Sequence, residues 1–351
     1  MSLVRNSNRY YVRPIFSKIK TKDSLFLGSS KLFFNEIELI TRGKTKTRSK
    51  FLKINEIKYL EPDIQRDINK RISNITKKRK KLGKFNFERS LVMGILNVTP
   101  DSFFDGGKYL LHDNAIEQFK KLIKEGADII DIGGESTRPG AEAISRNQEL
   151  ARVLPPITGL SRQNIKISVD TRHAEVMTRA CAAGATIIND VEALRRDGAV
   201  GAAAASGVPV IIMHMQGQPE TMQDAPHYDF APVDVYQFLE ERIKVAMVAG
   251  IAKPHIAIDP GFGFGKTVAH NLQILKWLSL FHGLGVPILF GASRKSTIAK
   301  LSKGEPAEQR LAGSLALAMA AYRQGAQILR VHDVAETVQA LAIEQALLQS
   351  E

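Results

Sequence analysis

The sequence predicts an α/β protein, a (β/α)8 TIM barrel preceded by a small basic N-terminal extension with a hairpin and a helix. Two observations carry this prediction. From residue 91 onward, short apolar stretches alternate with helical patterns, and most of these helical patterns end at a glycine. There are eight such units, and together they span roughly the 250 residues typical of such a barrel.

The predicted strands are nearly continuous apolar runs, as expected of a parallel sheet covered on both faces. They are Val92–Asn97, Asp128–Gly133, Lys166–Asp170, Thr186–Asp190, Pro209–His214, Ile256–Asp259, Pro287–Gly291 and Gln327–His332. In the first helix, Asp113 is the predicted N-cap and Gly126 the predicted end. An open doubly wound sheet is the alternative, but it would have fewer strands and a glycine-rich fingerprint after the first.

Residues 1–90 differ in composition from the remainder. The formal net charge is +13, and the excess of Lys and Arg lies in this segment, which also contains no alanine. Leu25–Ile40, with Gly28 and Ser30 at its turn, indicates a hairpin, and Pro62 opens a helix with isoleucines on one face. We therefore predict an extension of unassigned role, 1–90, and a catalytic barrel, 91–351.

Charge and cysteine content limit the class of protein. The basic run Lys77–Lys81 has no interleaved aromatic residues, so we interpret it as a solvated linker, and we do not expect a nucleic-acid partner. Cys181 is the single cysteine, which excludes an intramolecular disulfide and favours the cytoplasm. No apolar run is long enough for a membrane span.

Polar residues stand at the end of every predicted strand, where the active site of such a barrel lies. The first strand ends at Asn97 and continues into a glycine-bounded loop, the pattern of a site with a lid. The others end in or lead to Asp131, Asp170, Asn189, His214, Asp259, Ser293–Ser296 and Arg330–His332. Buried amides and carboxylates without partners are costly, so eight polar strand ends predict a ligand site.

The chemistry of this set indicates two kinds of ligand group. Asp170, Asn189, Asp259 and Lys295 supply acceptors and donors suited to a flat heterocycle with N–H and C=O groups along its edges. Arg330 and His332, with Asn97 and a divalent ion, suit a phosphate or pyrophosphate.

Three other motifs do not carry a function. Gly265-Lys266-Thr267 resembles the end of a P-loop, but Pro260 stands where the required glycine would be. Neighbouring glycines lack dinucleotide-binding spacing, and the histidines lack the helical pair of a zinc site. His214 is expected to make a structural hydrogen bond.

Taken together, these motifs resemble dihydropteroate synthase. They are Met93–Gly107, Asp131–Gly140, Ser168–Thr171, Ile188–Val191, His214–Gly217, Asp259–Lys266, Ser293–Ser296 and Arg330–His332. The resemblance implies a (β/α)8 homodimer in folate biosynthesis. Such an enzyme joins para-aminobenzoate to 6-hydroxymethyl-7,8-dihydropterin pyrophosphate, releases pyrophosphate, and is the target of sulfonamides. Because departure of pyrophosphate leaves a cationic methylene on the pterin, we expect an SN1-like step.

The resemblance also implies a role for individual residues. The pterin would be bound by Asp170, Asn189, Asp259, Lys295 and Met213. The pyrophosphate would be bound by Asn97, Arg330 and His332, with Mg2+ at Asn97. The para-aminobenzoate pocket would contain Thr137, Arg138, Pro139, Phe264 and Ser296. The residues implied to act in catalysis are Lys295, Arg330, His332, Asp105 and Arg138.

One residue departs from the family pattern, and two other functions stay open. Phe104 stands where the family commonly has a serine, so the packing of the first loop is expected to differ. A folate-dependent methyltransferase would share the barrel and the acidic pterin contacts but would need neither an arylamine pocket nor a pyrophosphate clamp. A non-catalytic pterin binder would bind pterin without releasing pyrophosphate.

Overall fold

The computed structural model describes residues 9–28, 30–43, 46–79, 81–83, 85–98, 108–136, 144–161, 166–218 and 221–350, with only the backbone for 108–114. The predicted barrel is confirmed. Eight parallel strands pair in the order β10-β9-β8-β7-β6-β5-β12-β11. A parallel bridge between Ile258 and Ile288 joins β10 to the residue before β11 and closes the sheet.

The barrel strands agree with the predicted ones to within a few residues. Pro209 and Pro287 lie just outside their strands, since proline has no N–H to donate to a ladder. The strands are β5 (Leu91–Asn97), β6 (Ile129–Gly133), β7 (Lys166–Asp170), β8 (Ile187–Asp190), β9 (Val210–Met213), β10 (Ile256–Asp259), β11 (Leu289–Phe290) and β12 (Ile328–Val331).

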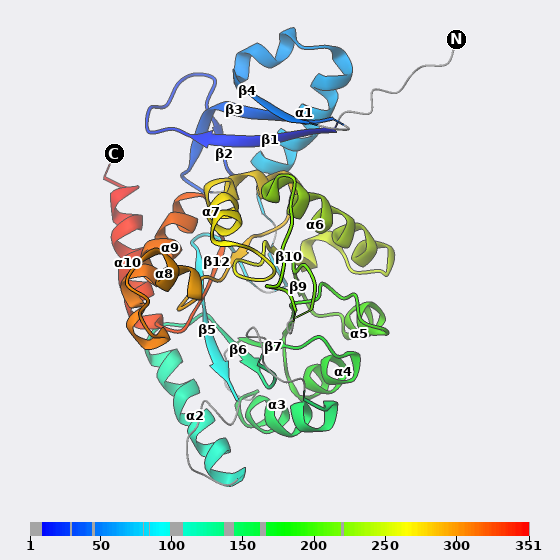
Figure 1. Cartoon of the computed structure of the whole chain (residues 1–351), viewed down its shortest axis with the longest axis vertical. Helices are drawn as coiled ribbons and strands as arrows, with labels where there is room; N and C mark the ends of the chain where they lie inside the picture. The colour runs from blue at the N-terminus through cyan, green and yellow to red at the C-terminus, as the bar shows by residue number, and fades with distance from the viewer. Residues whose placement is uncertain are drawn as a thin grey trace.

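Helices surround this sheet (Figure 1). They are α2 (Lys108–Lys124), α3 (Arg146–Leu160), α4 (Ala174–Ala183), α5 (Ala199–Ser206), α6 (Ala231–Val248), α7 (Val268–Lys276), α8 (Ser296–Leu301), α9 (Leu311–Arg323) and α10 (Val334–Leu347), with 3-10 turns η3 (Lys253–His255), η4 (Leu278–Leu284) and η5 (Ala307–Gln309). No described helix is both long and apolar enough to cross a bilayer.

The start of the first barrel helix was predicted wrongly. Asp113 is not its N-cap but lies inside α2, which already begins at Lys108. No glycine or proline stands between these two positions, so nothing prevents the helix from extending back. The predicted end is confirmed, because Gly126 follows the last helical residue by two positions and has a positive φ of 99°.

The extension is a four-stranded antiparallel sheet with one helix. Its strands are β1 (Arg9–Phe16), β2 (Leu25–Phe26), β3 (Phe33–Arg42) and β4 (Thr47–Lys53), followed by the turn η1 (Ile54–Tyr59) and helix α1 (Pro62–Thr76). The predicted hairpin, β2 with β3, and the predicted helix are confirmed. Strands β1 and β4 were not predicted.

The extension packs against the outside of the barrel. One face of its sheet covers α1, where Ile68 and Ile75 are buried, and the other face places Tyr11 and Ile40 in the main core. Figure 1 shows this sheet (blue) beside α6 and α7, at the end of the molecule opposite α2. Arg71 of α1 donates to the Tyr236 hydroxyl (2.5 Å) and pairs with the Glu240 carboxylate (2.6 Å), both on α6.

The last part of the extension plugs the base of the barrel. Leu82 and Phe85 are buried in a cluster with the first residues of five barrel strands, which are Leu91, Ile129, Ile187, Leu289 and Ile328. This plug covers the end at which the strands begin, and the active sites of such barrels lie at the other end, where the strands finish.

The plug gives a stability prediction. Leu82→Ala should lower the free energy of unfolding by about 2–5 kcal/mol, because it leaves a cavity in a fully buried cluster. Leu301→Ala is the matched control, since Leu301 is 54% exposed, and it should cost well under about 1 kcal/mol. Urea denaturation of both variants measures this, and equal small losses would contradict the role of the plug.

Candidate active site

Asn97, Gly133 and Asp170 end three neighbouring strands and stand beside one another in register. A Cβ at Gly133 would lie 3.6 Å from the Cβ of Asp170 and 3.7 Å from Oδ1 of Asn97. Because glycine has no side chain, none stands between the amide and the carboxylate. Two predicted site residues, Asn97 and Asp170, thus flank Gly133 at the end of β6, at the barrel mouth.

A buried ion-pair cluster organises the barrel interior next to these residues. The Nε of Arg330 donates to Oδ2 of Asp131 (2.6 Å), and its Nη2 donates to Oδ2 of Asp170 (2.8 Å). The amide of Asn189 donates to the same oxygen of Asp131 (3.0 Å). Asp170, Asn189 and Arg330, predicted from separate strands, are thus brought together. Asp131, predicted as a polar strand end without a ligand role, lies in the middle of β6 and connects Arg330 and Asn189.

Burial changes the protonation of the carboxyl groups in this cluster. Burial raises the pKa of Asp170 to about 7, while the positive charge of Arg330 acts in the opposite direction. Burial also raises the pKa of Asp190 to about 6, although the backbone N–H groups of Glu192 and Leu194 stabilise its carboxylate. Carboxyl groups that titrate near neutrality can accept or donate hydrogen bonds along the edge of a heterocycle.

Lys295 and Asp259 line the mouth on the side of β10. The ammonium of Lys295 donates to the carbonyl of Phe262 and lies 4.0 Å from the centroid of the Phe264 ring. Burial lowers the pKa of Lys295 to about 7, against the opposing charge of Asp259. The Asp259 carboxylate accepts from the N–H of Gly261 (2.7 Å), and burial raises its pKa.

An apolar surface lies beside these polar groups. Met213 is buried with Val191, Met215 and Met222, and Phe264 packs against them. Met213 ends β9 and pairs in register with Asp259. The predicted residues Met213, Asp259, Phe264 and Lys295 thus combine an apolar surface with charged edges, which suits aromatic rings.

Of the remaining predicted site residues, the structure describes His332 and Ser296. The imidazole Nδ1 of His332 lies 3.0 Å from the hydroxyl of Ser293, which also accepts from the His332 N–H (3.2 Å). Ser296 is exposed at the first position of α8, directly after Lys295. Asp105, Thr137, Arg138 and Pro139, together with Phe104, lie outside the described residues.

An ionic network beside this mouth, just beyond the ends of β6, β7 and β8, was not predicted from the sequence. Arg172 is 4% exposed, binds both carboxylate oxygens of Glu135 (2.8 Å each) and donates to Glu192 (2.7 Å). Glu135 also accepts a hydrogen bond from the N–H of Ile144 (3.4 Å). This bond links the described residues on either side of 137–143. The two partners of Arg172 lie 37 and 20 residues away from it in sequence, so no local pattern could have shown them.

The motif that resembled a P-loop has a structural role instead. Lys266 is buried, and its Nζ lies 2.9 Å from Nδ1 of His214 and 2.8 Å from the carbonyl of Gly261. The prediction that His214 makes a structural hydrogen bond is therefore confirmed. Lys266 points at the loop that precedes it and donates to that loop's own carbonyls, as well as to His214.

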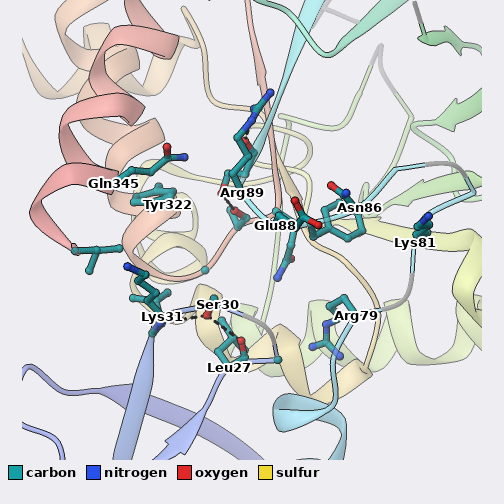
Figure 2. Close-up of a pocket in the computed structure, with 18 of the residues that line it drawn as sticks. Leu27, Ser30, Lys31, Arg79, Lys81, Asn86, Glu88, Arg89, Tyr322 and Gln345 are labelled. Carbon is teal, nitrogen blue, oxygen red and sulfur yellow. Dashed lines mark hydrogen bonds between the residues drawn. The ribbon is translucent and has the colours of Figure 1, made fainter.

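A large hollow of about 880 Å3 lies at the opposite end of the barrel, between the extension and the starts of β5 and β12. Figure 2 shows residues of both parts around it, including Leu27, Lys31, Arg79, Glu88, Tyr322 and Gln345. No predicted site residue lines it. The hollow is therefore separate from the mouth described above.

Similarity to known proteins defines the class of enzyme to which this chain belongs. Residues 93–332 match the family described as pterin binding enzyme. The dihydropteroate synthase of Escherichia coli strain K12 is 50% identical over 258 residues, covering 73% of this chain and 91% of that protein. That of Haemophilus influenzae is 49% identical over 257 residues, covering 73% and 93%. The chain belongs to the pterin-binding enzyme family.

Solved structures agree with this assignment. A Yersinia pestis dihydropteroate synthase with a sulfonamide drug complex has a TM-score of 0.72 and 49% identity, and the match covers 76% of this chain and 97% of that one. A Xanthomonas albilineans dihydropteroate synthase in complex with 7,8-dihydropteroate has a TM-score of 0.69 and 49% identity, with 75% and 95% covered. The matched share corresponds to the barrel in length.

The low pKa of Lys295 gives a pH prediction. In the unfolded chain a lysine keeps its proton up to roughly pH 10.4, whereas in the folded protein burial lowers the pKa of Lys295 to about 7. The unfolded state then binds more protons between these values, so this group makes stability rise with pH in that interval. Urea denaturation near pH 7 and pH 9 should show a smaller rise for Lys295→Met than for the wild type. An equal rise in both would contradict the pKa assignment.

The Arg172 network gives a second prediction for this region. Arg172→Met leaves the carboxylates of Glu135 and Glu192 without their buried partner, and should lower the free energy of unfolding by about 3–5 kcal/mol. Arg179→Met removes an exposed arginine that pairs with Glu175 at 3.8 Å, and it should cost less than about 1 kcal/mol. Chemical denaturation tests the pair, and similar losses would show that the network contributes little.

Proposed function

We propose that the chain condenses para-aminobenzoate with 6-hydroxymethyl-7,8-dihydropterin pyrophosphate, giving 7,8-dihydropteroate and pyrophosphate in folate biosynthesis. The observation that carries this proposal is the group of Asp170, Asn189, Asp259 and Lys295 around one barrel mouth, next to Arg330. The relatives named above are dihydropteroate synthases at about half identity over most of their length. Residues 91–351 act as the catalytic barrel and residues 1–90 as an extension.

The pterin ring is the ligand for the buried polar residues. Its edge presents alternating N–H and C=O groups, which the carboxyl groups of Asp170 and Asp259 and the amide of Asn189 can match. Lys295, at a pKa of about 7, donates to a ring acceptor whether or not it carries the extra proton. Met213 packs against a ring face.

The pyrophosphate is the ligand for Arg330, His332 and Asn97. The bond between the pterin methylene carbon and the pyrophosphate oxygen breaks first, and both electrons leave with the oxygen. The amine nitrogen of para-aminobenzoate then bonds to the methylene and releases a proton. In this SN1-like order the site must stabilise an anion on one side and a cation on the other. The neighbouring carboxylates, Asp131 and Asp170, are placed to favour the cation.

Mg2+ fits the anion side of this site. Asn97 supplies an amide oxygen beside Gly133, and Mg2+ prefers oxygen ligands. The described residues contain no cluster of three or more His, Cys, Asp or Glu side chains that could hold a metal, so the pyrophosphate and water would supply most of the ligands. When bound, Mg2+ neutralises charge on the leaving group.

The arylamine binds where Phe264 and Ser296 adjoin Lys295. The family resemblance implies that Thr137, Arg138 and Pro139 would complete this pocket and that Asp105 would belong to a loop closing over it. The Yersinia pestis dihydropteroate synthase has been solved with a sulfonamide drug complex, and we infer that sulfonamides compete with para-aminobenzoate here. The family resemblance supports a homodimer. The single cysteine supports a cytoplasmic location.

A coupled assay of pyrophosphate release tests the function. The wild type should release pyrophosphate in the presence of para-aminobenzoate, and Lys295→Ala should lower kcat/KM by about 100-fold or more, because it removes a donor placed at the reacting ring. Lys300→Ala, an exposed lysine on α8, is the matched control and should behave as the wild type.

Two outcomes would contradict this account. Unchanged turnover in Lys295→Ala would refute the site assignment. If the wild type never released pyrophosphate in the absence of para-aminobenzoate or an analogue, the SN1-like order would be wrong.

A further inference from the structure

The loop of residues 261–265, between Asp259-Pro260 and Lys266, is held by side chains along its whole length. Each of its five carbonyl oxygens accepts a hydrogen bond from a side chain. The donors are Lys266 to Gly261 (2.8 Å) and to Phe264 (3.0 Å), Lys295 to Phe262, Gln223 to Gly263 (2.7 Å) and Tyr228 to Gly265 (2.7 Å). Surface loops usually leave such groups to water. Side chains from outside the loop and Lys266 at its end therefore satisfy every carbonyl of this loop.

Lys266 is the centre of this arrangement. It is 3% exposed, and its Nζ has three close polar partners, which are the carbonyls of Gly261 and Phe264, to which it donates, and Nδ1 of His214 (2.9 Å). These three partners satisfy the hydrogen bonds that a lysine amine can make. Burial lowers the pKa of both Lys266 and His214 well below their usual values. Burying a lysine amine without a hydrogen-bonded carboxylate is costly, so packing alone does not explain a lysine here.

The backbone of the loop is built around the same contact. Gly261 has a φ of +71°, and a Cβ at this position would lie 1.8 Å from the carbonyl oxygen of His214. The loop thus lies directly against the end of β9, and no other residue could take the place of Gly261 without moving it. His214 and Lys266 together set the distance between β9 and the loop.

The loop in turn places two proposed substrate contacts. The ring centroid of Phe264, a residue of this loop, lies 4.0 Å from Nζ of Lys295. The carbonyl of Phe262, in the same loop, accepts a hydrogen bond from that Nζ. If the loop moved, both contacts to Lys295 would change together. Of the proposed pterin contacts, Asp170 and Asn189 belong to β7 and β8, away from this loop, whereas Asp259 and Lys295 adjoin it.

We propose that Lys266 is a positioning residue for the arylamine substrate, fixing the 261–265 loop so that Phe264 and Lys295 form one wall of the para-aminobenzoate pocket. This inference rests on the proposed function. Lys266, the lysine of the Gly-Lys-Thr motif, would thus influence which arylamine binds by fixing the loop, and it would not contact phosphate. We therefore expect arylamine affinity to depend on Lys266 more than pterin affinity does, because Phe264 of the arylamine pocket is part of the loop whereas the pterin contacts Asp170 and Asn189 are not.

The test compares Lys266→Met with the matched control Lys300→Met, an exposed lysine. The KM for para-aminobenzoate is measured by pyrophosphate release, and the Kd of 6-hydroxymethylpterin by calorimetry. Lys266→Met should raise this KM about tenfold or more, in line with the loss of a charged hydrogen bond, and change the pterin Kd less. Lys300→Met should change neither.

A second variant keeps the test informative if Lys266→Met does not fold. Tyr228→Phe removes only the hydroxyl that donates to Gly265, and it should raise the same KM several-fold with little change in the pterin Kd.

A merely structural role would lower the melting temperature and the active fraction while leaving the KM unchanged. An unchanged KM, or equal losses for both ligands, would overturn the proposal. Absence of turnover in the wild type would instead refute the proposed function.

Discussion

The carboxylate of Asp131 is the constraint on which the barrel mouth depends. It is fully buried, and one of its oxygens accepts from Arg330 (2.6 Å) and from Asn189 (3.0 Å). An isolated buried carboxylate would be too costly to keep, so the guanidinium must remain beside it. Arg330 then extends the constraint to Asp170 through its second hydrogen bond. One buried charge therefore fixes polar groups on β6, β7, β8 and β12 before any substrate binds.

The loops above these strands follow the same principle, since cationic side chains hold the protein's own backbone. Lys266 binds the carbonyls of the 261–265 loop, and Arg242 of α6 donates to the carbonyls of Ala193 and Leu194. Those two residues have positive φ values of 56° and 59°, a conformation that costs about 1–3 kcal/mol per residue and persists only where the surroundings enforce it. The enzyme thus stabilises costly loop geometry from outside, and the site needs little rearrangement to bind a rigid ring.

The sequence predicted the barrel because its strands are buried on both faces and end in polar residues, which is how Asp170, Asn189 and Asp259 were found. It did not predict β4 (Thr47–Lys53), an exposed edge strand of basic residues that lacks alternating burial. Arg172 was missed for another reason, because its ionic partners become neighbours only when three strand ends meet in the folded barrel. Local patterns therefore reveal elements and strand ends, while the ionic contacts that fix the site depend on tertiary structure.

The central claim is that the Asp131–Arg330 pair prepares the pterin site. Calorimetric titration of 6-hydroxymethylpterin into the wild type and into Asp131→Asn, with circular dichroism to confirm that both are folded, tests it most directly. Loss of a charge-assisted hydrogen bond of about 1.5–3 kcal/mol predicts binding weaker by roughly 10- to 100-fold in the variant. Equal affinity in two folded proteins would contradict the claim.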